Sequence, residues 1–140
     1  MVNPTIVFDT NALISALMYP ASVSALSLVN AVKHFQLVAS DSTWAELEEV
    51  SARQKFAGFW TAQNRLVFLT ELAAMTDFYR THSVITASSD VSDNKFLELA
   101  LDAESKLIIS GDSDLRSLNP FHGIAIISPS DFLKLLGESQ

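Results

Sequence analysis

Short apolar runs alternate with helix-like stretches along this chain of 140 residues, and that alternation constrains the fold most. The strand candidates are rich in β-branched residues and cover Thr5–Phe8, Phe35–Ala39, Ser83–Thr86, Leu107–Ser110 and Ile124–Ile127. Strands that are separated by helices, without hairpin turns between them, pair in parallel. Right-handed crossovers then place helices on both faces of the sheet. The sequence therefore predicts one α/β domain over residues 1–140, with a doubly wound, mostly parallel sheet.

The spacing of apolar residues predicts where the helices lie. They are expected at Ala12–Leu17, Ser22–Lys33, Thr61–Tyr79, Ser92–Ala103 and Ser130–Leu136, the last capped by Ser128 or Ser130. A further helix is expected to begin at a cap formed by Asp41 or Ser42. The looser stretch Arg53–Trp60 is expected to hold only a short helical turn. The polar stretch Ala87–Ser89 is expected to be a loop.

Composition narrows the class of protein. Hydrophobic residues make up 49% of the chain, which is typical of a compact domain. Cysteine is absent, so disulfides, thiol catalysis and cysteine-ligated metals are excluded. No apolar run reaches the roughly 18 residues that a bilayer span needs, and no signal peptide is recognisable, so a cytoplasmic location is expected. The net charge of −7 counts against tight metal-free binding of nucleic acid and suits a basic partner.

Four acidic residues stand where a predicted strand ends or a predicted helix begins. They are Asp9, Glu46, Asp93 and Asp112. Ligands of an open parallel sheet bind beyond the carboxyl ends of the strands, so these side chains are expected to converge in one pocket. Carboxylates packed together repel one another and need a cation, and Mg²⁺ or Mn²⁺ suits an all-oxygen site. The pattern predicts a metal-dependent enzyme acting on a phosphodiester.

Each of these acids also has a simpler structural interpretation. Asp9 and Asp112 are common residue types at turns and helix caps. Asp93 could likewise be an N-cap or first-turn acid of a helix. It shares a helix face with Phe96 and Ala100, however, which aims it at the sheet. These alternatives leave the assignment open for any one residue taken alone.

Glu46 is the least distinctive of the four acids. It lies beside Glu48 and Glu49, and a run of acids is typical of a solvated helix face. Leu47 and Val50 flank Glu46 on the side expected to face the core. That placement favours Glu46 over its two acidic neighbours.

Four segments in this order resemble the PIN-domain nucleases, particularly the VapC-like toxins of bacterial toxin–antitoxin pairs. The segments are Val7–Asn11, Ala45–Leu47 followed by Arg53 and Lys55, Asp90–Ala100, and Ile109–Leu115. The resemblance implies a three-layer sandwich on a five-stranded parallel sheet, and endonucleolytic cleavage of RNA with Mg²⁺ or Mn²⁺. It also implies an antitoxin protein as partner, and a homodimer.

The same resemblance assigns roles to individual residues. Asp9, Glu46, Asp93 and Asp112 would be the catalytic, metal-binding quartet, referred to below as the acidic quartet. Asn11 and Ser110 would be polar supports, and Asp114 an extra acid and metal ligand. Water activated by the metal would attack the phosphodiester and leave 5′-phosphate and 3′-hydroxyl ends.

Other interpretations stay open. One is a catalytically inactive PIN-like module that binds a partner, its acids serving as caps. Another is a phosphoryl-transfer domain with Asp9 as covalent acceptor, although haloacid-dehalogenase-like phosphatases carry Asp where this chain has Asn11.

The histidines and basic residues are weaker candidates for a functional role. His34, His82 and His122 lack metal-ligand spacing and are expected to be structural or at the surface. Arg53, Lys55, Arg65, Lys95 and Arg116 are candidates for phosphate contacts, with solvated surface charge the favoured interpretation.

Overall fold

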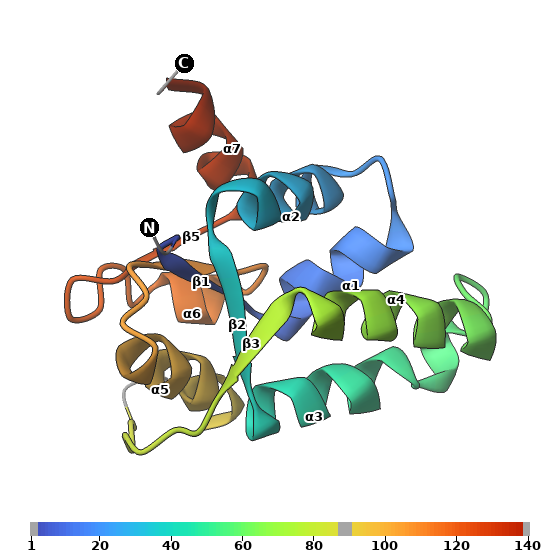
Figure 1. Ribbon diagram of the computed structural model, residues 1–140, viewed down its shortest axis with the longest axis horizontal. Coiled ribbons are helices and arrows are strands. Elements are labelled where there is room, and N and C mark those ends of the chain that lie inside the picture. Colours follow the sequence, from blue (N-terminus) through green and yellow to red (C-terminus); the bar gives the residue numbers. More distant parts are fainter. Residues whose placement is uncertain (1–2, 87–90, 139–140) are drawn as a thin grey trace.

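Five short parallel strands form the centre of the protein (Figure 1). The computed structural model describes residues 3–86 and 91–138. The sheet has the order β3-β2-β1-β4-β5, and each neighbouring pair is parallel. The strands are β1 (Thr5–Phe8), β2 (Gln36–Ser40), β3 (Thr76–Tyr79), β4 (Leu107–Ile109) and β5 (Ala125–Ile127).

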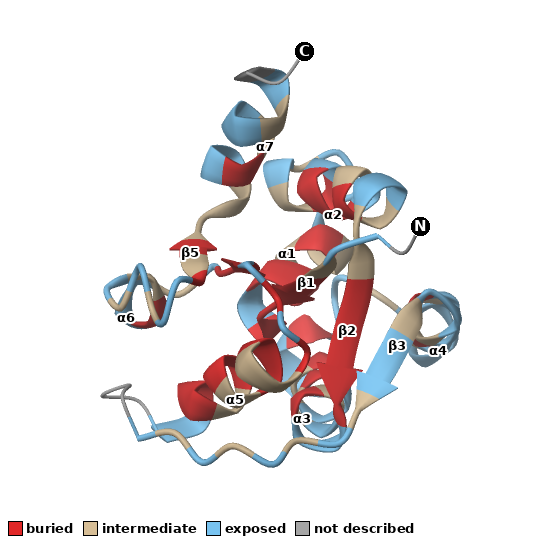
Figure 2. Cartoon of the chain, turned by 60° about the vertical axis from the view of Figure 1, so that its left-hand side comes forward, coloured by how far each residue is buried: buried red, intermediate tan, exposed pale blue. Residues whose placement is uncertain are grey.

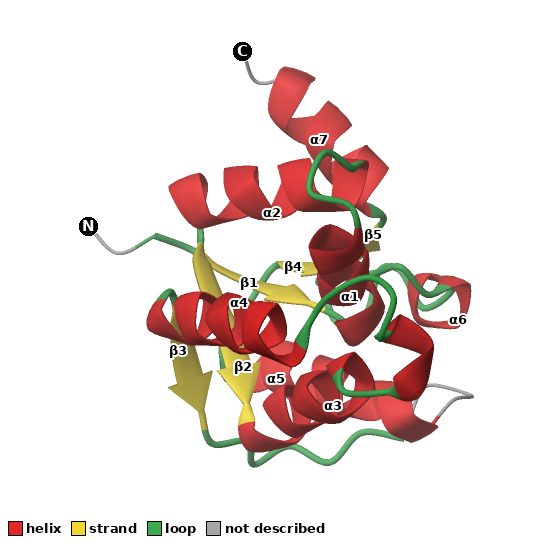
Figure 3. Cartoon of the chain, turned by 90° about the vertical axis from the view of Figure 1, so that its right-hand side faces the viewer, coloured by secondary structure: helices red, strands yellow, loops and turns green. Residues whose placement is uncertain are grey.

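Helices connect the strands and cover both faces of the sheet. They are α1 (Thr10–Met18), α2 (Val23–His34), α3 (Asp41–Ser51), α4 (Ala62–Ala74), α5 (Asn94–Asp102), α6 (Ser113–Arg116) and α7 (Pro129–Glu138), with 3-10 turns η1 (Gln54–Phe56) and η2 (Val91–Asp93). In Figure 3, α1 and α4 lie in front of the strands and α5 lies behind them. The three-layer α/β sandwich on a parallel five-stranded sheet is therefore confirmed.

Alternation along the strands divides the core into two layers. Ile6 and Phe8 of β1 face the side that packs against α1, α2, α3, α4 and α7. Val7 of β1 faces the opposite side, where it joins Phe96 of α5 and Leu115 of α6. Successive side chains of a strand point to opposite faces, so a strand covered on both faces is apolar throughout. Figure 2 shows this as continuous burial along β1 and β2, whereas the edge strand β3 is largely exposed.

The predictions fail at the third strand. Thr76–Tyr79 was expected to be the last turn of a long helix, and Ser83–Thr86 to be the strand. The helix ends at Ala74, Thr76 Oγ1 donates to the carbonyl of Leu72, and the chain then pairs with β2. The spacing of apolar residues over this segment suits a helix equally well, and only pairing with the open edge of β2 decides against it.

The structure corrects two smaller predictions and confirms the others to within one or two residues. Ser40, rather than Asp41 or Ser42, caps α3, because Ser40 and Thr43 form a reciprocal capping box. A short helix, α6, follows β4 where no helix was expected. The loop predicted at Ala87–Ser89 lies outside the described residues.

The helices were also tested for membrane spans. Over the described residues, no single helix is long and apolar enough to cross a membrane, and the bent pair α1 and α2 meets the test by length and composition only.

Candidate active site

A polar cleft of about 230 Å³ opens beyond the carboxyl ends of the strands. All four members of the acidic quartet line it, and they come from four separate segments: Asp9 at the start of α1, Glu46 on α3, Asp93 at the start of α5 and Asp112 at the start of α6. Asn11, Arg53, Lys55 and Ser92 also line the cleft. The fold therefore brings the predicted quartet together in one place.

Asp9 is held in place by several hydrogen bonds. It follows β1 directly and is only 3% exposed. Its Oδ1 accepts a hydrogen bond of 2.8 Å from the amide of Ala12, so it caps α1. Its Oδ2 accepts a bond of 2.6 Å from Ser110 Oγ, and the amide of Gly111 lies 3.2 Å from both oxygens. Asp9 is thus both a helix cap and a residue of the cleft.

Burial raises the pKa of Asp9 above its ordinary value of 3.8. The hydrogen bonds from Ser110, Ala12 and Gly111 act in the opposite direction, and the nearby charge of Asp112 adds to the increase. The buried charge is therefore incompletely compensated by its hydrogen bonds. A cation in the cleft would complete that compensation.

The segment after β4 approaches the start of α1 closely. Phe8 and Ile109 are paired across β1 and β4, which brings Ser110 and Gly111 beside Asp9. A Cβ on Gly111 would lie only 3.2 Å from Asn11 Cβ. A larger residue at this position would therefore require Asn11 to shift by a few tenths of an ångström. Ser110 is fully buried and supports Asp9, whereas Asn11 is exposed and lines the cleft.

Asp93 and Asp112 enter the cleft from the starts of two helices. Asp93 is 8% exposed and stands at the N-cap position of α5, but its side chain makes no capping bond within that described helix. Asp112 is half-buried and caps α6 by accepting a 2.9 Å bond from the amide of Asp114. Asp114 itself is exposed and does not line the cleft, so the structure does not bring it together with the quartet.

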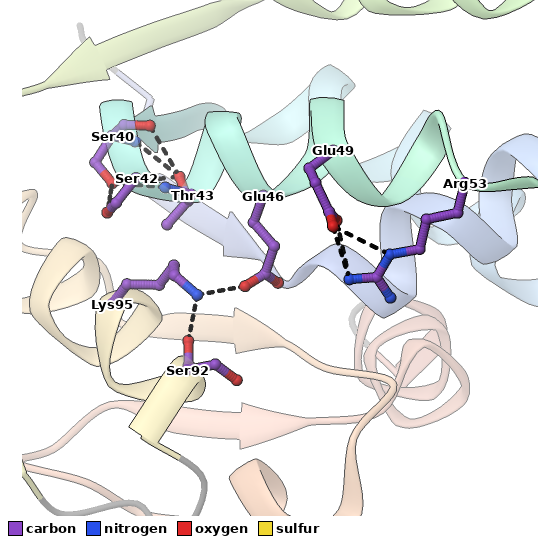
Figure 4. A network of polar contacts seen from close by, with 8 residues as sticks. All are labelled: Ser40, Ser42, Thr43, Glu46, Glu49, Arg53, Ser92 and Lys95. Carbon is purple, nitrogen blue, oxygen red and sulfur yellow. Dashed lines mark hydrogen bonds and ion pairs between the residues drawn. The ribbon is translucent and has the colours of Figure 1, made fainter.

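Glu46 of the cleft forms an ion pair with Lys95, which connects α3 to α5 (Figure 4). Leu47 beside it is buried, and Glu48 is exposed. Glu49 pairs instead with Arg53 at 2.9 Å. Of the three acids in this stretch, only Glu46 lines the cleft, as the placement of its apolar neighbours predicts.

Three of the five basic candidates make specific contacts that the sequence did not reveal. Lys95 binds Glu46, so the expectation of a solvated charge is wrong there. Arg116 donates to the carbonyl of Ser110 at 2.9 Å, and Arg65 donates to Ser51 Oγ at 2.8 Å. These partners are distant in sequence or on irregular backbone, so periodicity carries no signal for them.

Aromatic residues beside the cleft belong mainly to the core. Phe56 is 8% exposed and stacks on Trp60, with ring centroids 5.1 Å apart. Phe59 is 49% exposed. His34, His82 and His122 are exposed, and none of them lines the cleft, as expected.

The donor set of the cleft suits a hard divalent cation, since four carboxylates and the Asn11 amide supply oxygen ligands. The side chains are not drawn together around one point, however. Over residues 3–86 and 91–138, no group of three acidic or histidine side chains is close enough to hold a metal ion as it stands. Glu46 is paired with Lys95, and Asp9 accepts a hydrogen bond from Ser110, so both carboxylates already have partners.

Comparison with known proteins defines the class. The family model described as PIN domain matches residues 5–114, and the chain belongs to the PIN domain family. Members of this family are generally nucleases that use divalent metal ions. A comparison with curated protein sequences finds no significant match.

The solved structures with a similar fold include two that match most of the chain. PAE2754 from Pyrobaculum aerophilum has a TM-score of 0.64 and 14% identity, and the match covers 96% of this chain and 90% of that one. VapBC2 from Rickettsia felis, solved bound to a DNA fragment from their promoter, has a TM-score of 0.60 and 11% identity. That match covers 87% of this chain and 96% of the other. At these identities the similarity shows the fold alone.

Proposed function

We propose that this PIN domain is a Mg²⁺- or Mn²⁺-dependent endoribonuclease and the toxin of a toxin–antitoxin pair. The observation that supports this function best is the convergence of Asp9, Glu46, Asp93 and Asp112 on one polar cleft from four separate segments. Helix caps alone give no reason for four carboxylates to share one cleft, because their mutual repulsion is unfavourable.

The acidic quartet would hold the metal, with Asn11 beside it and Asp114 as a more distant acid. Bound Mg²⁺ or Mn²⁺ supplies the activation of the attacking water. Ser110 and Gly111 fix the orientation of Asp9 through their hydrogen bonds. Attack by water, rather than by the 2′-hydroxyl of RNA, leaves 5′-phosphate and 3′-hydroxyl ends.

Basic residues on the rim of the cleft favour a phosphate-containing substrate. Arg53 and Lys55 line the same cleft as the quartet, although the chain as a whole carries a charge of −7. A local cation can position a phosphate while the bulk charge stays acidic. The choice of RNA over DNA rests on the resemblance to VapC-like toxins.

The partners we propose are an antitoxin protein and a second copy of the chain, in the cytoplasm. Apolar side chains are exposed on α2 at Leu26 and Val29, and on α4 at Leu66 and Val67. Exposed apolar side chains of this kind supply contact area for another protein. The similar fold of VapBC2 agrees with this proposal.

Cleavage of a labelled RNA panel with Mg²⁺, Mn²⁺ or EDTA tests the enzymatic proposal. Wild-type protein is compared with Asp93→Asn purified identically, which excludes a contaminating ribonuclease. We expect metal-dependent cleavage to be lost in the variant. Equal activity in both proteins, or ends carrying a 2′,3′-cyclic phosphate, would contradict the proposed mechanism. If both proteins are inactive but still bind metal, the RNA panel lacks the substrate or a partner is missing. If neither protein cleaves RNA or binds metal, the second candidate, an inactive partner-binding module, is favoured.

A further inference from the structure

Lys95 is a basic residue of the first turn of α5 whose side chain reaches the acidic quartet. Its ammonium group lies against Glu46 Oε2 and also donates to the carbonyl of Ser92 at 2.5 Å. Figure 4 shows it extending from α5 toward Glu46 on α3. The two side chains are 20% and 25% exposed. Because the pair is mostly shielded from water, its attraction is screened less than that of a surface pair.

The two basic residues that line the cleft, Arg53 and Lys55, are held by groups other than Glu46. Arg53 is bound to Glu49, one turn further along α3 than Glu46. Lys55 lies over the ring of Phe56, with Nζ 5.1 Å from the ring centroid. Both residues line the cleft, yet Lys95 is the one whose contact engages a proposed metal ligand.

A lysine ammonium group and a divalent cation compete for the same carboxylate. Both are strongly hydrated, compact positive charges that bind oxygen. When they share one carboxylate in a partly buried cleft, they repel each other strongly. Metal binding by Glu46 is therefore coupled to the position of Lys95.

We propose that Lys95 is a positioning residue that sets the metal affinity of the cleft. Its ammonium group neutralises Glu46 until a divalent cation takes its place. The displaced ammonium group then joins Arg53 and Lys55 as a third positive charge for a substrate phosphate. This inference rests on the proposed function, since it requires Glu46 to be a metal ligand.

Calorimetric titration of Mn²⁺ into EDTA-treated protein tests this role without measuring activity. Lys95→Met keeps the length of the side chain and removes its charge. The control Lys55→Met removes a charge that lines the cleft and lies over Phe56 rather than against Glu46. We expect Lys95→Met to bind Mn²⁺ about 10-fold more tightly than the wild type, and Lys55→Met to change the affinity by less than about 3-fold. In a Glu46→Gln background, Lys95→Met should have no larger effect than Lys55→Met.

Lys95→Arg provides a second measurement that does not depend on the folding of Lys95→Met. A guanidinium group binds a carboxylate through two hydrogen bonds, so this variant should bind Mn²⁺ more weakly than the wild type. Circular dichroism establishes that each variant is folded.

The possible failures are distinguishable. If the wild type binds Mn²⁺ and Lys95→Met binds it equally well or more weakly, the role of Lys95 is overturned and the proposed function stands. An increase in affinity that persists unchanged in the Glu46→Gln background overturns the role as well. If neither wild type nor Lys95→Met binds Mn²⁺, both the inference and the metal-dependent function are wrong.

Discussion

Replacement of Ser110 by alanine removes a fully buried hydroxyl that connects two members of the acidic quartet. Ser110 Oγ donates to Asp9 Oδ2 at 2.6 Å and accepts from the amide of Asp112 at 3.0 Å. The substitution removes one atom and leaves the backbone of β4 and α6 able to keep its conformation. Its effect therefore reports on these two hydrogen bonds.

The loss of stability can be estimated from these two hydrogen bonds. A hydrogen bond to an ionised group contributes about 1.5–3 kcal/mol, and the half-buried amide of Asp112 can find water instead. We expect Ser110→Ala to lower the free energy of unfolding by about 2–3 kcal/mol at neutral pH. For a domain of this size, that corresponds to a decrease in Tm of roughly 6–12 °C.

The pKa of Asp9 determines how the destabilisation by Ser110→Ala changes with pH. Burial raises the pKa of Asp9 in the folded state, and the bond from Ser110 opposes that increase. A group with a raised folded pKa contributes stability below its unfolded pKa, near 3.8, and loses it as the pH rises through the folded pKa. Without Ser110 the folded pKa of Asp9 rises further, so the protein loses more stability as the pH rises from 4 to neutral. The difference between variant and wild type should therefore be largest at neutral pH and decrease toward pH 4.

Urea denaturation from pH 4 to pH 8 in EDTA measures this difference. Ser27→Ala is the matched control, because Ser27 is also fully buried and donates to the carbonyl of Ser24 at 2.8 Å within α2. It should cost about 1 kcal/mol, independent of pH. A destabilisation by Ser110→Ala that is the same at pH 4 and pH 7 would refute the reasoning about Asp9.

Three further substitutions, two of them paired with a control variant, test residues in and beside the cleft. Asp9→Asn should abolish RNA cleavage. It should also make the stability of the metal-free protein, measured by urea denaturation, less dependent on pH between 4 and 7. An unchanged pH profile would show that another group dominates this dependence. Gly111→Ala should destabilise the protein by about 1–2 kcal/mol in thermal unfolding, because its Cβ would lie 3.2 Å from a side-chain carbon in α1. Gly137→Ala, with open space around its Cβ, should be neutral or stabilising. Asp112→Asn should reduce the rate of RNA cleavage at least about 100-fold. Asp114→Asn should retain that rate within about 3-fold, because Asp114 does not line the cleft. Equal losses of activity in the two variants would place both acids in the site.

The fold could be predicted where local pattern and tertiary environment agree. Thr5–Phe8 and Leu107–Ile109 are continuous apolar runs because helices cover both faces of the sheet at these strands. The strand Thr76–Tyr79 is different, since it lies at the exposed edge and is held by pairing with β2. Its sequence lacks a buried run, so no local pattern distinguishes it from a continuing helix.

The convergence of the acidic quartet on one cleft could also be predicted from the sequence. The ends of parallel strands and the starts of the following helices meet at one edge, so their acids converge whatever the details of packing. The ion pair between Glu46 and Lys95 joins residues 49 positions apart in the sequence and depends on how α3 packs against α5. A sequence contains no local signal for such a contact.

The most direct test of the central claim is a crystal structure with Mn²⁺, measured by anomalous diffraction. The acidic quartet should ligate the ion, so we predict an anomalous peak within about 2.5 Å of oxygens from Asp9, Asp93 or Asp112, with Glu46 turned away from Lys95. Full Mn²⁺ occupancy elsewhere and none in this cleft would contradict the account.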